Sequence, residues 1–172
     1  RFAAGPDKRT MPNRPHPAQW RWLAPGECKA PLWGGNLDTM AAMTGTGFLD
    51  PPAEFILFWE SQSPLGRVRQ CFAQLRQAGL LKGVRGMIVG RFPTSSASDT
   101  AAVHSWLRSS YGSTMPILTD VELGHTDPMI TLPIGASATL RSGEESFSLS
   151  LPTCHVPPPY EYARPVLSTL HH

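Results

Sequence analysis

The chain lacks the features that mark several large classes of protein. No apolar run approaches the ~18 to 20 residues that a membrane-spanning helix needs, and no signal-peptide pattern opens the sequence. Clusters of Lys and Arg are missing as well, because the net charge is only +2 and the basic residues are scattered. We therefore expect a protein that binds neither membrane nor nucleic acid.

Cysteine is scarce too. Cys28, Cys71 and Cys154 are odd in number and lie far apart in the sequence. They form neither a disulfide framework nor the Cys-x-x-Cys spacing of a metal site. We expect a reduced, cytoplasmic protein that holds no metal and no other cofactor.

A serine nucleophile motif is also absent, although its partners are present. The 172 residues contain no Gly-x-Ser-x-Gly, the sharp turn that carries a reactive serine. Yet Glu60 directly follows the apolar run Phe55–Trp59, and His125 follows Gly124 in a turn between two strand-like stretches. A carboxylate at a strand end and a histidine on a tight turn are two parts of a Ser-His-Glu relay. The sequence therefore predicts half of an enzyme.

Proline is the compositional excess, and it marks the ends of the chain. The 18 prolines are concentrated near both termini, whereas the middle is rich enough in hydrophobic residues to form one core. We expect residues 1–19 to be a linker or interdomain loop, residues 20–152 to form the folded domain, and residues 153–172 to be a Pro-rich tail. His171 and His172 resemble the start of an expression tag and receive no role.

Strand-like and helix-like segments alternate through the middle of the chain. The expected elements, in order, are a strand over Lys29–Trp33 broken by Gly34-Gly35, a helix capped by Asn36 and reaching about Met43, a strand over Phe55–Trp59, a helix over Gly66–Ala78, a strand over Val84–Phe92, a helix capped by Asp99 and ending near Gly112, a strand over Ile117–Leu123, and strands over Met129–Pro133, Ala136–Leu140 and Phe147–Leu151. This order predicts an α/β fold, with a mixed sheet, flanking helices and a β-rich C-terminal part.

Six fragments, in order and at matching spacing, resemble a known family. They are Leu32-Trp33-Gly34-Gly35-Asn36-Leu37, Thr44-Gly45-Thr46, Ile56-Leu57-Phe58-Trp59-Glu60, Leu75–Leu80, Gly86–Phe92, and Gly124-His125-Thr126 with Thr131–Ala136. Together they resemble the C-terminal domain of the LD-carboxypeptidases, a serine-peptidase family that also contains the microcin-immunity carboxypeptidases. The approach Trp20–Leu23 is more similar to the microcin-immunity branch. The resemblance implies a swivelling β/β/α-like domain.

The resemblance also implies a mechanism and partners. A serine in an N-terminal domain, which these residues do not include, would attack the scissile carbonyl. His125 would transfer the proton and Glu60 would orient the imidazole. The substrate would be a peptide or peptide-nucleotide amide, and neither a metal nor a cysteine would take part. We expect the chain alone to be inactive, and we expect its uncovered face to form a homodimer.

Other interpretations stay open for several residues. Gly34, Gly35 and Asn36 suit either a substrate-facing turn or a plain turn with a helix cap. Gln70 stands where the resemblance places an arginine of the family, so either Arg67 or Arg69 would replace that contact or the contact would be absent, and Trp59 is bulkier than the expected aliphatic residue. Two alternatives for the whole chain are a binding module that retains the fold and a zinc site. The zinc site would combine His125 with His104, Cys154 and His155, although His104 is better explained as a surface or packing residue.

Overall fold

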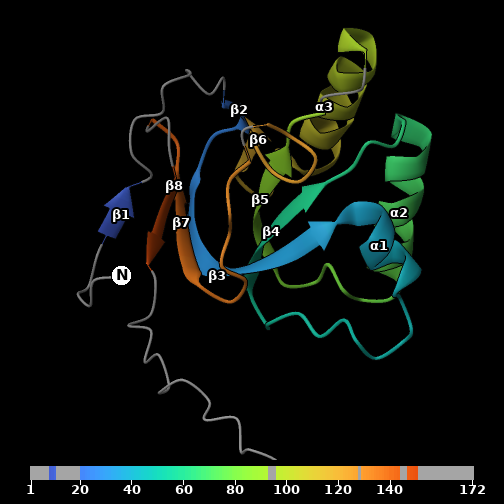
Figure 1. Ribbon diagram of the computed structural model, residues 1–172, viewed down its shortest axis with the longest axis horizontal. Coiled ribbons are helices and arrows are strands. Elements are labelled where there is room, and N and C mark those ends of the chain that lie inside the picture. Colours follow the sequence, from blue (N-terminus) through green and yellow to red (C-terminus); the bar gives the residue numbers. More distant parts are fainter. Residues whose placement is uncertain (1–7, 11–19, 93–95, 128, 144–146, 151–172) are drawn as a thin grey trace, which may run out of the picture.

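The computed structural model describes residues 8–10, 20–92, 96–127, 129–143 and 147–150 (Figure 1). Most of the expected linker over residues 1–19 and the whole expected tail over residues 153–172 lie outside this part of the chain. The elements in chain order are β1 (Lys8–Thr10), β2 (Arg21–Ala24), β3 (Glu27–Asn36), α1 (Leu37–Ala42), β4 (Phe55–Glu60), α2 (Leu65–Gln77), β5 (Val84–Gly90), α3 (Ala97–Tyr111), β6 (Ile117–Val121), β7 (Ser137–Arg141) and β8 (Phe147–Ser150).

One mixed sheet organises the described residues. Its eight strands follow the order β1-β8-β7-β3-β4-β5-β6-β2. The four central strands, β3 to β6, are parallel, and the remaining pairs on both flanks are antiparallel. The predicted α/β fold is confirmed, and the three apolar runs expected to share a sheet are its neighbours β4, β5 and β6.

Strand β3 joins the two parts of the sheet. Its first half pairs with β7 over Glu27–Pro31, and its second half pairs with β4 over Leu32–Asn36. The sheet curls along this strand. The curl brings β5 and β7 together, since a Cβ placed on Gly86 of β5 would lie 3.0 Å from Cδ1 of Leu140 in β7. Strands that are not paired therefore face each other across the curl.

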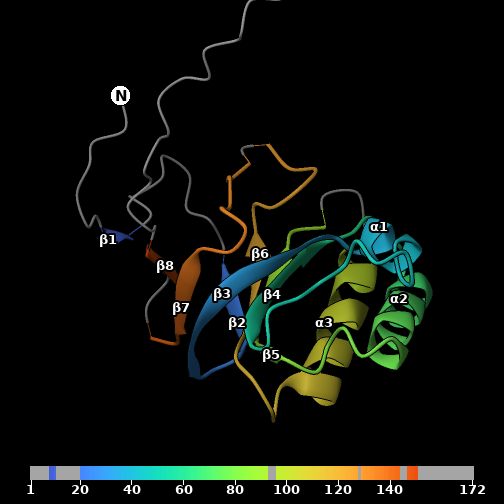
Figure 2. The same ribbon diagram turned by 90° about the horizontal axis from the view of Figure 1, so that it is seen from below.

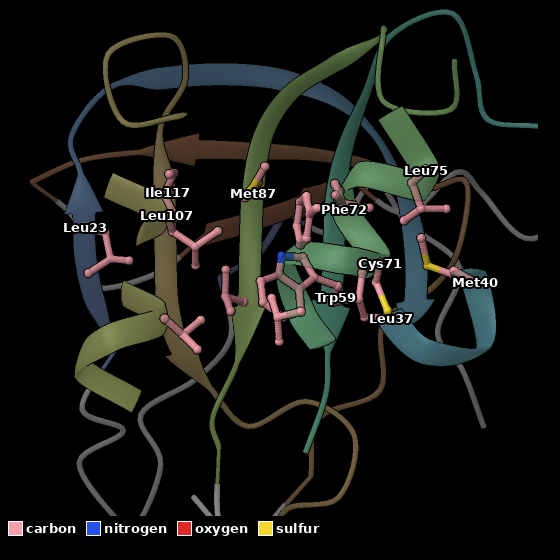
Figure 3. Close-up of a cluster of buried hydrophobic side chains, with 14 of the residues drawn as sticks. Leu23, Leu37, Met40, Trp59, Cys71, Phe72, Leu75, Met87, Leu107 and Ile117 are labelled. Carbon is pink, nitrogen blue, oxygen red and sulfur yellow. The ribbon is translucent and has the colours of Figure 1, made fainter. Parts of the chain in front are cut away.

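The strands bury both of their faces. Alternate residues of β4 point to opposite sides: Phe55, Leu57 and Trp59 pack under the helices, and Ile56 packs in the curl. All three helices cover the first face (Figure 2). There Trp59 packs edge-on against Phe72 of α2, with ring centroids 5.2 Å apart (Figure 3). A parallel strand covered on both sides needs this nearly continuous apolar run.

Three expected details are wrong. The strand does not break at Gly34-Gly35 but continues through them to Asn36. The reason is that Gly34, which has no Cβ, allows the paired backbone of Phe58 in β4 to approach closely. Helix α3 is capped by Ser96, whose hydroxyl accepts from Asp99 N, since the N-cap needs the extended backbone found there.

The third correction concerns Met129–Pro133, which forms no strand. Among the described residues, its Ile130 N donates to the carbonyl of Glu122, which directly follows β6, at 2.8 Å. Ile130 is buried in the core within the curl, so its apolar character serves packing instead of a ladder of strand hydrogen bonds. No helix in the described part of the chain is long and apolar enough to cross a membrane.

Candidate functional site

The candidate site lies where three strands of the sheet end. Asn36 is the last residue of β3 and Glu60 the last of β4, and the two are paired in the parallel register. His125 follows β6 by four residues. Because parallel strands present their carboxyl ends at one edge, this edge is the usual place for a site in an α/β fold.

Glu60 and His125 are in direct contact. His125 Nδ1 lies 3.1 Å from Glu60 Oε2. Glu60 is buried, whereas the His125 side chain is 63% exposed. A carboxylate only accepts hydrogen bonds, so the contact assigns the proton to Nδ1 in the neutral ring. Nε2, on the far side of the ring, is then free to accept a proton.

Asn36 holds the other oxygen of the same carboxylate. Its Nδ2 donates to Glu60 Oε1 at 2.7 Å, while its Oδ1 accepts from the backbone N of Thr39 at 2.9 Å and caps α1. The cap predicted at Asn36 is therefore confirmed. The same side chain also orients Glu60, a contact that no local pattern in the sequence predicts.

Two glycines make room for the Glu60 side chain. A Cβ placed on Gly124 would lie 2.3 Å from Glu60 Cδ, and one placed on Gly90 would lie 2.8 Å from Glu60 Cβ. Gly124 also has a φ of +69°, which an L-residue rarely adopts. The turn before His125 therefore depends on glycine for both its conformation and its closeness to Glu60.

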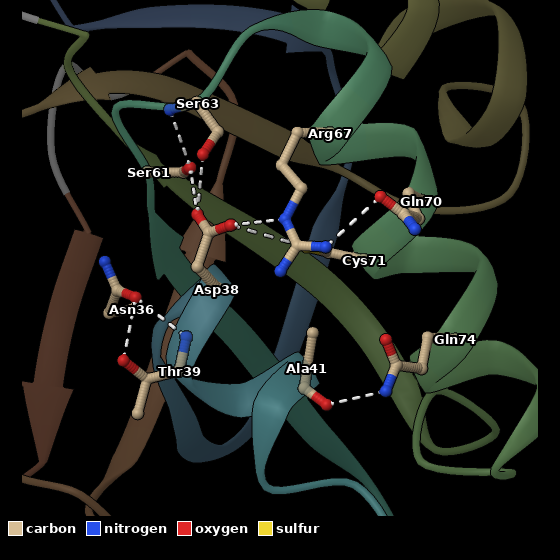
Figure 4. Close-up of polar contacts among 10 residues, drawn as sticks. All are labelled: Asn36, Asp38, Thr39, Ala41, Ser61, Ser63, Arg67, Gln70, Cys71 and Gln74. Carbon is tan, nitrogen blue, oxygen red and sulfur yellow. Dashed lines mark hydrogen bonds and ion pairs between the residues drawn. The ribbon is translucent and has the colours of Figure 1, made fainter.

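A polar network centred on Asp38 ties together the elements around Glu60 (Figure 4). Asp38, in the first turn of α1, accepts from Ser61 Oγ at 2.8 Å, Ser63 Oγ at 3.0 Å and Arg67 Nε at 2.8 Å. Burial opposes the charge of Asp38, but the bonds from Arg67, Ser61 and Ser63 outweigh it and lower the pKa of this carboxyl. The network fixes α1, α2 and the chain directly after Glu60 to one another.

The Asp38 network includes Arg67, one of the two arginines that were considered as alternatives. Arg67 pairs with Asp38 through Nε and donates through Nη1 to Gln70 Oε1 at 3.2 Å, whereas its replacement of the family's arginine stays a prediction. Asp38 and Ser61 were not predicted from the sequence. An acidic residue in the first helical turn and a serine directly after Glu60 were the available signals, but both are common in proteins.

The thiol beside this network is a poor nucleophile. Cys71 Sγ lies 3.7 Å from Asp38 Oδ1 in the buried face of α2. Burial and the neighbouring charge of Asp38 raise the pKa of this thiol, which keeps it protonated. Only the thiolate attacks carbonyls efficiently, so the chemistry of the site does not lie with Cys71.

Gly34 has a packing role. A Cβ at this position would overlap Phe58 O of the paired strand at 1.7 Å. Gly35 has open space around its Cα, with no heavy atom within 4 Å of an added Cβ. Of the three residues expected near substrate, Asn36 thus lies against Glu60, Gly34 is fixed by strand pairing, and Gly35 faces free volume.

His104 lies on α3 and is buried, so the expected packing role fits it better than the expected surface role. Its Nδ1 accepts from Arg21 Nη2 at 2.9 Å, and its Nε2 lies 3.8 Å from Asp120 Oδ1. Among the described residues, no group of three or more His, Cys, Asp or Glu side chains is arranged to hold a metal ion. Cys154 and His155, the other expected zinc ligands, lie outside those residues.

The burial of His104 predicts that the free energy of unfolding of this chain decreases in mild acid. Burial, with Arg21 and Arg108 nearby, lowers the pKa of His104 from its ordinary 6.5, and Asp120 only partly opposes this. Above pH 6.5 the ring is neutral in both states and contributes no pH dependence. Below it, the unfolded chain takes up a proton that the folded chain resists, so the free energy of unfolding should fall.

Urea unfolding between pH 7.5 and 5 measures this slope, and His104→Gln should flatten it while keeping an acceptor for Arg21. Asp38 does not interfere with this measurement. Its lowered pKa stabilises the folded chain at all of these pH values, and that stabilisation is lost mainly as the pH falls below the ordinary pKa of 3.8. An equal slope in the wild-type chain and the variant would contradict the assignment.

The fold and the site together define a class of protein. A carboxylate–histidine pair with a free imidazole nitrogen, placed at the carboxyl edge of parallel strands, is an arrangement of hydrolytic enzymes. Residues 29–140 match the model of the LD-carboxypeptidase C-terminal domain, and the chain belongs to this family.

Individual relatives agree with this membership. The "probable murein peptide carboxypeptidase" of Bacillus subtilis is 26% identical over 132 residues, which cover 72% of this chain and 40% of that protein. The crystal structure of muramoyltetrapeptide carboxypeptidase from Oxalobacter formigenes is 31% identical with a TM-score of 0.62, covering 78% of this chain and 50% of that one. The crystal structure of an MccF-like protein from Bacillus anthracis is 27% identical with a TM-score of 0.63, and the match covers 78% of this chain and 43% of that one. The chain therefore spans about two fifths to one half of the length of these relatives.

Proposed function

We propose that this chain provides Glu60 and His125 to a serine-type LD-carboxypeptidase whose nucleophilic serine lies in an N-terminal domain. The observation that carries the proposal is the contact of 3.1 Å between Glu60 Oε2 and His125 Nδ1. Asn36 supports it, because it holds the second carboxylate oxygen and leaves Glu60 no other orientation without losing that bond. An oriented carboxylate that positions a histidine is what a serine relay requires.

The proposed reaction uses the free nitrogen of the imidazole. His125 Nε2 takes the proton of the incoming serine hydroxyl as that oxygen attacks the scissile carbonyl, and it later donates this proton to the leaving amine. Glu60 keeps the proton on Nδ1 and stabilises the imidazolium while it lasts. Water then hydrolyses the acyl-enzyme by the same route. No metal and no thiol takes part in these steps.

The proposed substrate is an amide within a small peptide or a peptide-nucleotide. The name of one relative, a murein peptide carboxypeptidase, supports the peptide class, whereas the peptide-nucleotide class rests on the resemblance to the microcin-immunity branch. Gly35 and Asn36 lie at the same strand edge as Glu60, so a substrate contact over Gly34, Gly35 and Asn36 stays a prediction. Asn36 is the strongest of the three, since its side chain touches Glu60.

The alternative, a binding module that keeps the fold without chemistry, needs a weakened polar environment around the pair. Both carboxylate oxygens of Glu60 have a partner, and the glycines that accommodate this side chain are present. These observations favour the enzyme.

The proposed partner is the serine-bearing domain of the same protein, covering the face that carries His125. Two of the large apolar side chains that are exposed among the described residues, Met129 at 61% and Ile134 at 68%, follow His125 in the connection to β7. Exposed apolar side chains beside a site are typical of an interface. In the isolated chain we propose that this face mediates a homodimer.

Reconstitution tests the proposed function. The 172-residue chain alone should not release the terminal residue from an L,D-linked tetrapeptide, because the nucleophile and most of the oxyanion stabilisation would be missing. A fusion to the serine-bearing domain of a family member, such as the Oxalobacter formigenes enzyme, should restore turnover. An aspartyl-nucleotide amide assayed in parallel separates the two substrate classes.

Two controls make the outcome interpretable. Replacing the nucleophilic serine of the added domain by Ala must abolish the restored activity, and chelators must leave it unchanged. Turnover by the chain alone, or a well-folded fusion that hydrolyses neither substrate, would contradict the proposal.

A further inference from the structure

A second polar site lies between the edge strand β2 and helix α3. Its pocket is lined by Arg21 and Leu23 of β2 and by one face of α3, comprising Ala101, His104, Ser105 and Arg108. None of these residues contacts Glu60 or His125, or belongs to the Asp38 network. The site is therefore separate from the proposed catalytic edge.

A buried polar group forms the floor of this pocket. His104 is 5% exposed, and its Nδ1 accepts from Arg21 Nη2 at 2.9 Å. Because a guanidinium only donates, the proton of the neutral ring must be on Nε2. That N–H is buried without a hydrogen-bond partner among the described residues, since Asp120 Oδ1 at 3.8 Å lies beyond bonding distance. An unsatisfied buried donor is costly, so this one requires an explanation.

Backbone strain accompanies the same cluster. Asp120, in β6, has a φ of +63° and is the one non-glycine residue with positive φ in the described part of the chain. Its carboxylate pairs with Arg21 at 3.3 Å. Strained residues of this kind concentrate at binding and catalytic sites. Asp120 and His104 thus both contact Nη2 of Arg21 and hold its guanidinium at the pocket wall.

Charge and shape then indicate the ligand. The guanidinium of Arg108 forms no ion pair or hydrogen bond with another described residue, so it is available in the same pocket as the fixed guanidinium of Arg21. With His104 neutral, the single negative charge of Asp120 leaves this cluster net positive. Leu23 and Ala101 add an apolar wall. Two guanidinium groups match the oxygens of a phosphate or carboxylate, and a fixed arginine loses less entropy on binding.

We propose that this pocket binds a small organic anion, with its oxyanion group between Arg21 and Arg108 and its apolar part against Leu23 and Ala101. Phosphate and carboxylate ligands share this chemistry, so the test includes one of each. The site provides the chain with a ligand-binding function in addition to its proposed part in catalysis.

Titrations of the 172-residue chain with phenyl phosphate and benzoate, followed by ¹H–¹⁵N spectra, test the proposal. At least one probe should bind saturably, with shifts confined to β2 and to the part of α3 from Ala101 to Arg108, and the tighter probe identifies the oxyanion. Arg108→Gln should weaken binding by about 10-fold or more, a loss typical of a charged hydrogen bond. Arg69→Gln, an exposed arginine on α2, should leave binding unchanged.

Phenol provides the neutral comparison and should bind at least about 10-fold more weakly than the better anion. Three outcomes would overturn the proposal: no saturation by either anion up to about 10 mM, equal binding by phenol, or equal affinity in Arg108→Gln. Shifts centred on His125 instead of α3 would also overturn it, because the anion would then occupy the catalytic edge. Arg108 is exposed, so the variant should fold as the parent does.

Discussion

Replacing His125 by Ala is expected to lower kcat of the reconstituted carboxypeptidase by about 10⁴-fold or more, the size of loss typical when a relay histidine is removed. The reason is the contact between Nδ1 and Glu60, which leaves Nε2 as the one imidazole nitrogen free to move the serine proton. Removing the ring removes both the base and the later acid. KM should change little, because this loss concerns the transition state.

Two further variants of the reconstituted enzyme make this test sharper: Glu60→Ala, and the double variant that combines it with His125→Ala. Groups that act as a unit are not additive, so the double variant should be no slower than His125→Ala alone. Glu54→Gln is the matched control, since Glu54 directly precedes the same strand at its opposite end and is exposed. Full activity of His125→Ala, or two independent losses that multiply in the double variant, would contradict the relay.

The second large effect is expected from the smallest change in the site. In Gly124→Ala the new methyl group would occupy space within 2.3 Å of Glu60 Cγ and Cδ, and the backbone would need a φ of +69°. Either Glu60 moves or the turn changes, and both separate Glu60 from His125. We expect kcat of the reconstituted enzyme to fall by about 10²-fold or more, as misplacing a catalytic group by ~1 Å can do.

The variant Gly135→Ala separates the effect of backbone strain from the effect of displacing Glu60. Gly135 lies in the same connection between β6 and β7 with a similar φ of +83°, but nothing lies within 4 Å of an added Cβ. It should lose stability by about 1 kcal/mol through backbone strain alone and retain its kcat. Thermal unfolding and kcat measured on both variants distinguish strain from displacement of Glu60. Equal kcat losses in the two variants would show that Glu60 plays no special part in the Gly124 effect.

Much of the architecture was predictable because its signals are local. The apolar runs of β4, β5 and β6 and the helical spacing of Val68, Cys71, Phe72 and Leu75 place these elements within a few residues of their observed bounds. Asn36 was predictable as a cap, since a short polar side chain before an amphipathic segment has few other uses. The family could be inferred from ordered fragments, and the match over residues 29–140 confirms it.

The errors occurred where tertiary contacts decide the local structure. A pair of glycines is a local signal for a break, but Gly34 continues the strand because it packs on the Phe58 carbonyl of its neighbour. Met129–Pro133 has the pattern of a strand, yet Ile130 fills the core within the curl and the segment forms no strand. Asp38 and its partners Ser61, Ser63 and Arg67 carry no pattern that distinguishes them before the helices are packed.

The class of fold, the helix cap at Asn36 and the choice of Glu60 and His125 for the proposed chemistry could all be inferred from the amino-acid sequence. Those properties follow from periodicity, from turn chemistry and from the resemblance of short motifs. Three further features became visible in the folded chain: Asn36 holds Glu60, Gly90 and Gly124 accommodate its side chain, and Arg21 and Arg108 line one pocket. Each of these depends on atoms from strands and helices far apart in the chain. Their distances are set by sheet register and by the curl, neither of which is encoded in any single segment.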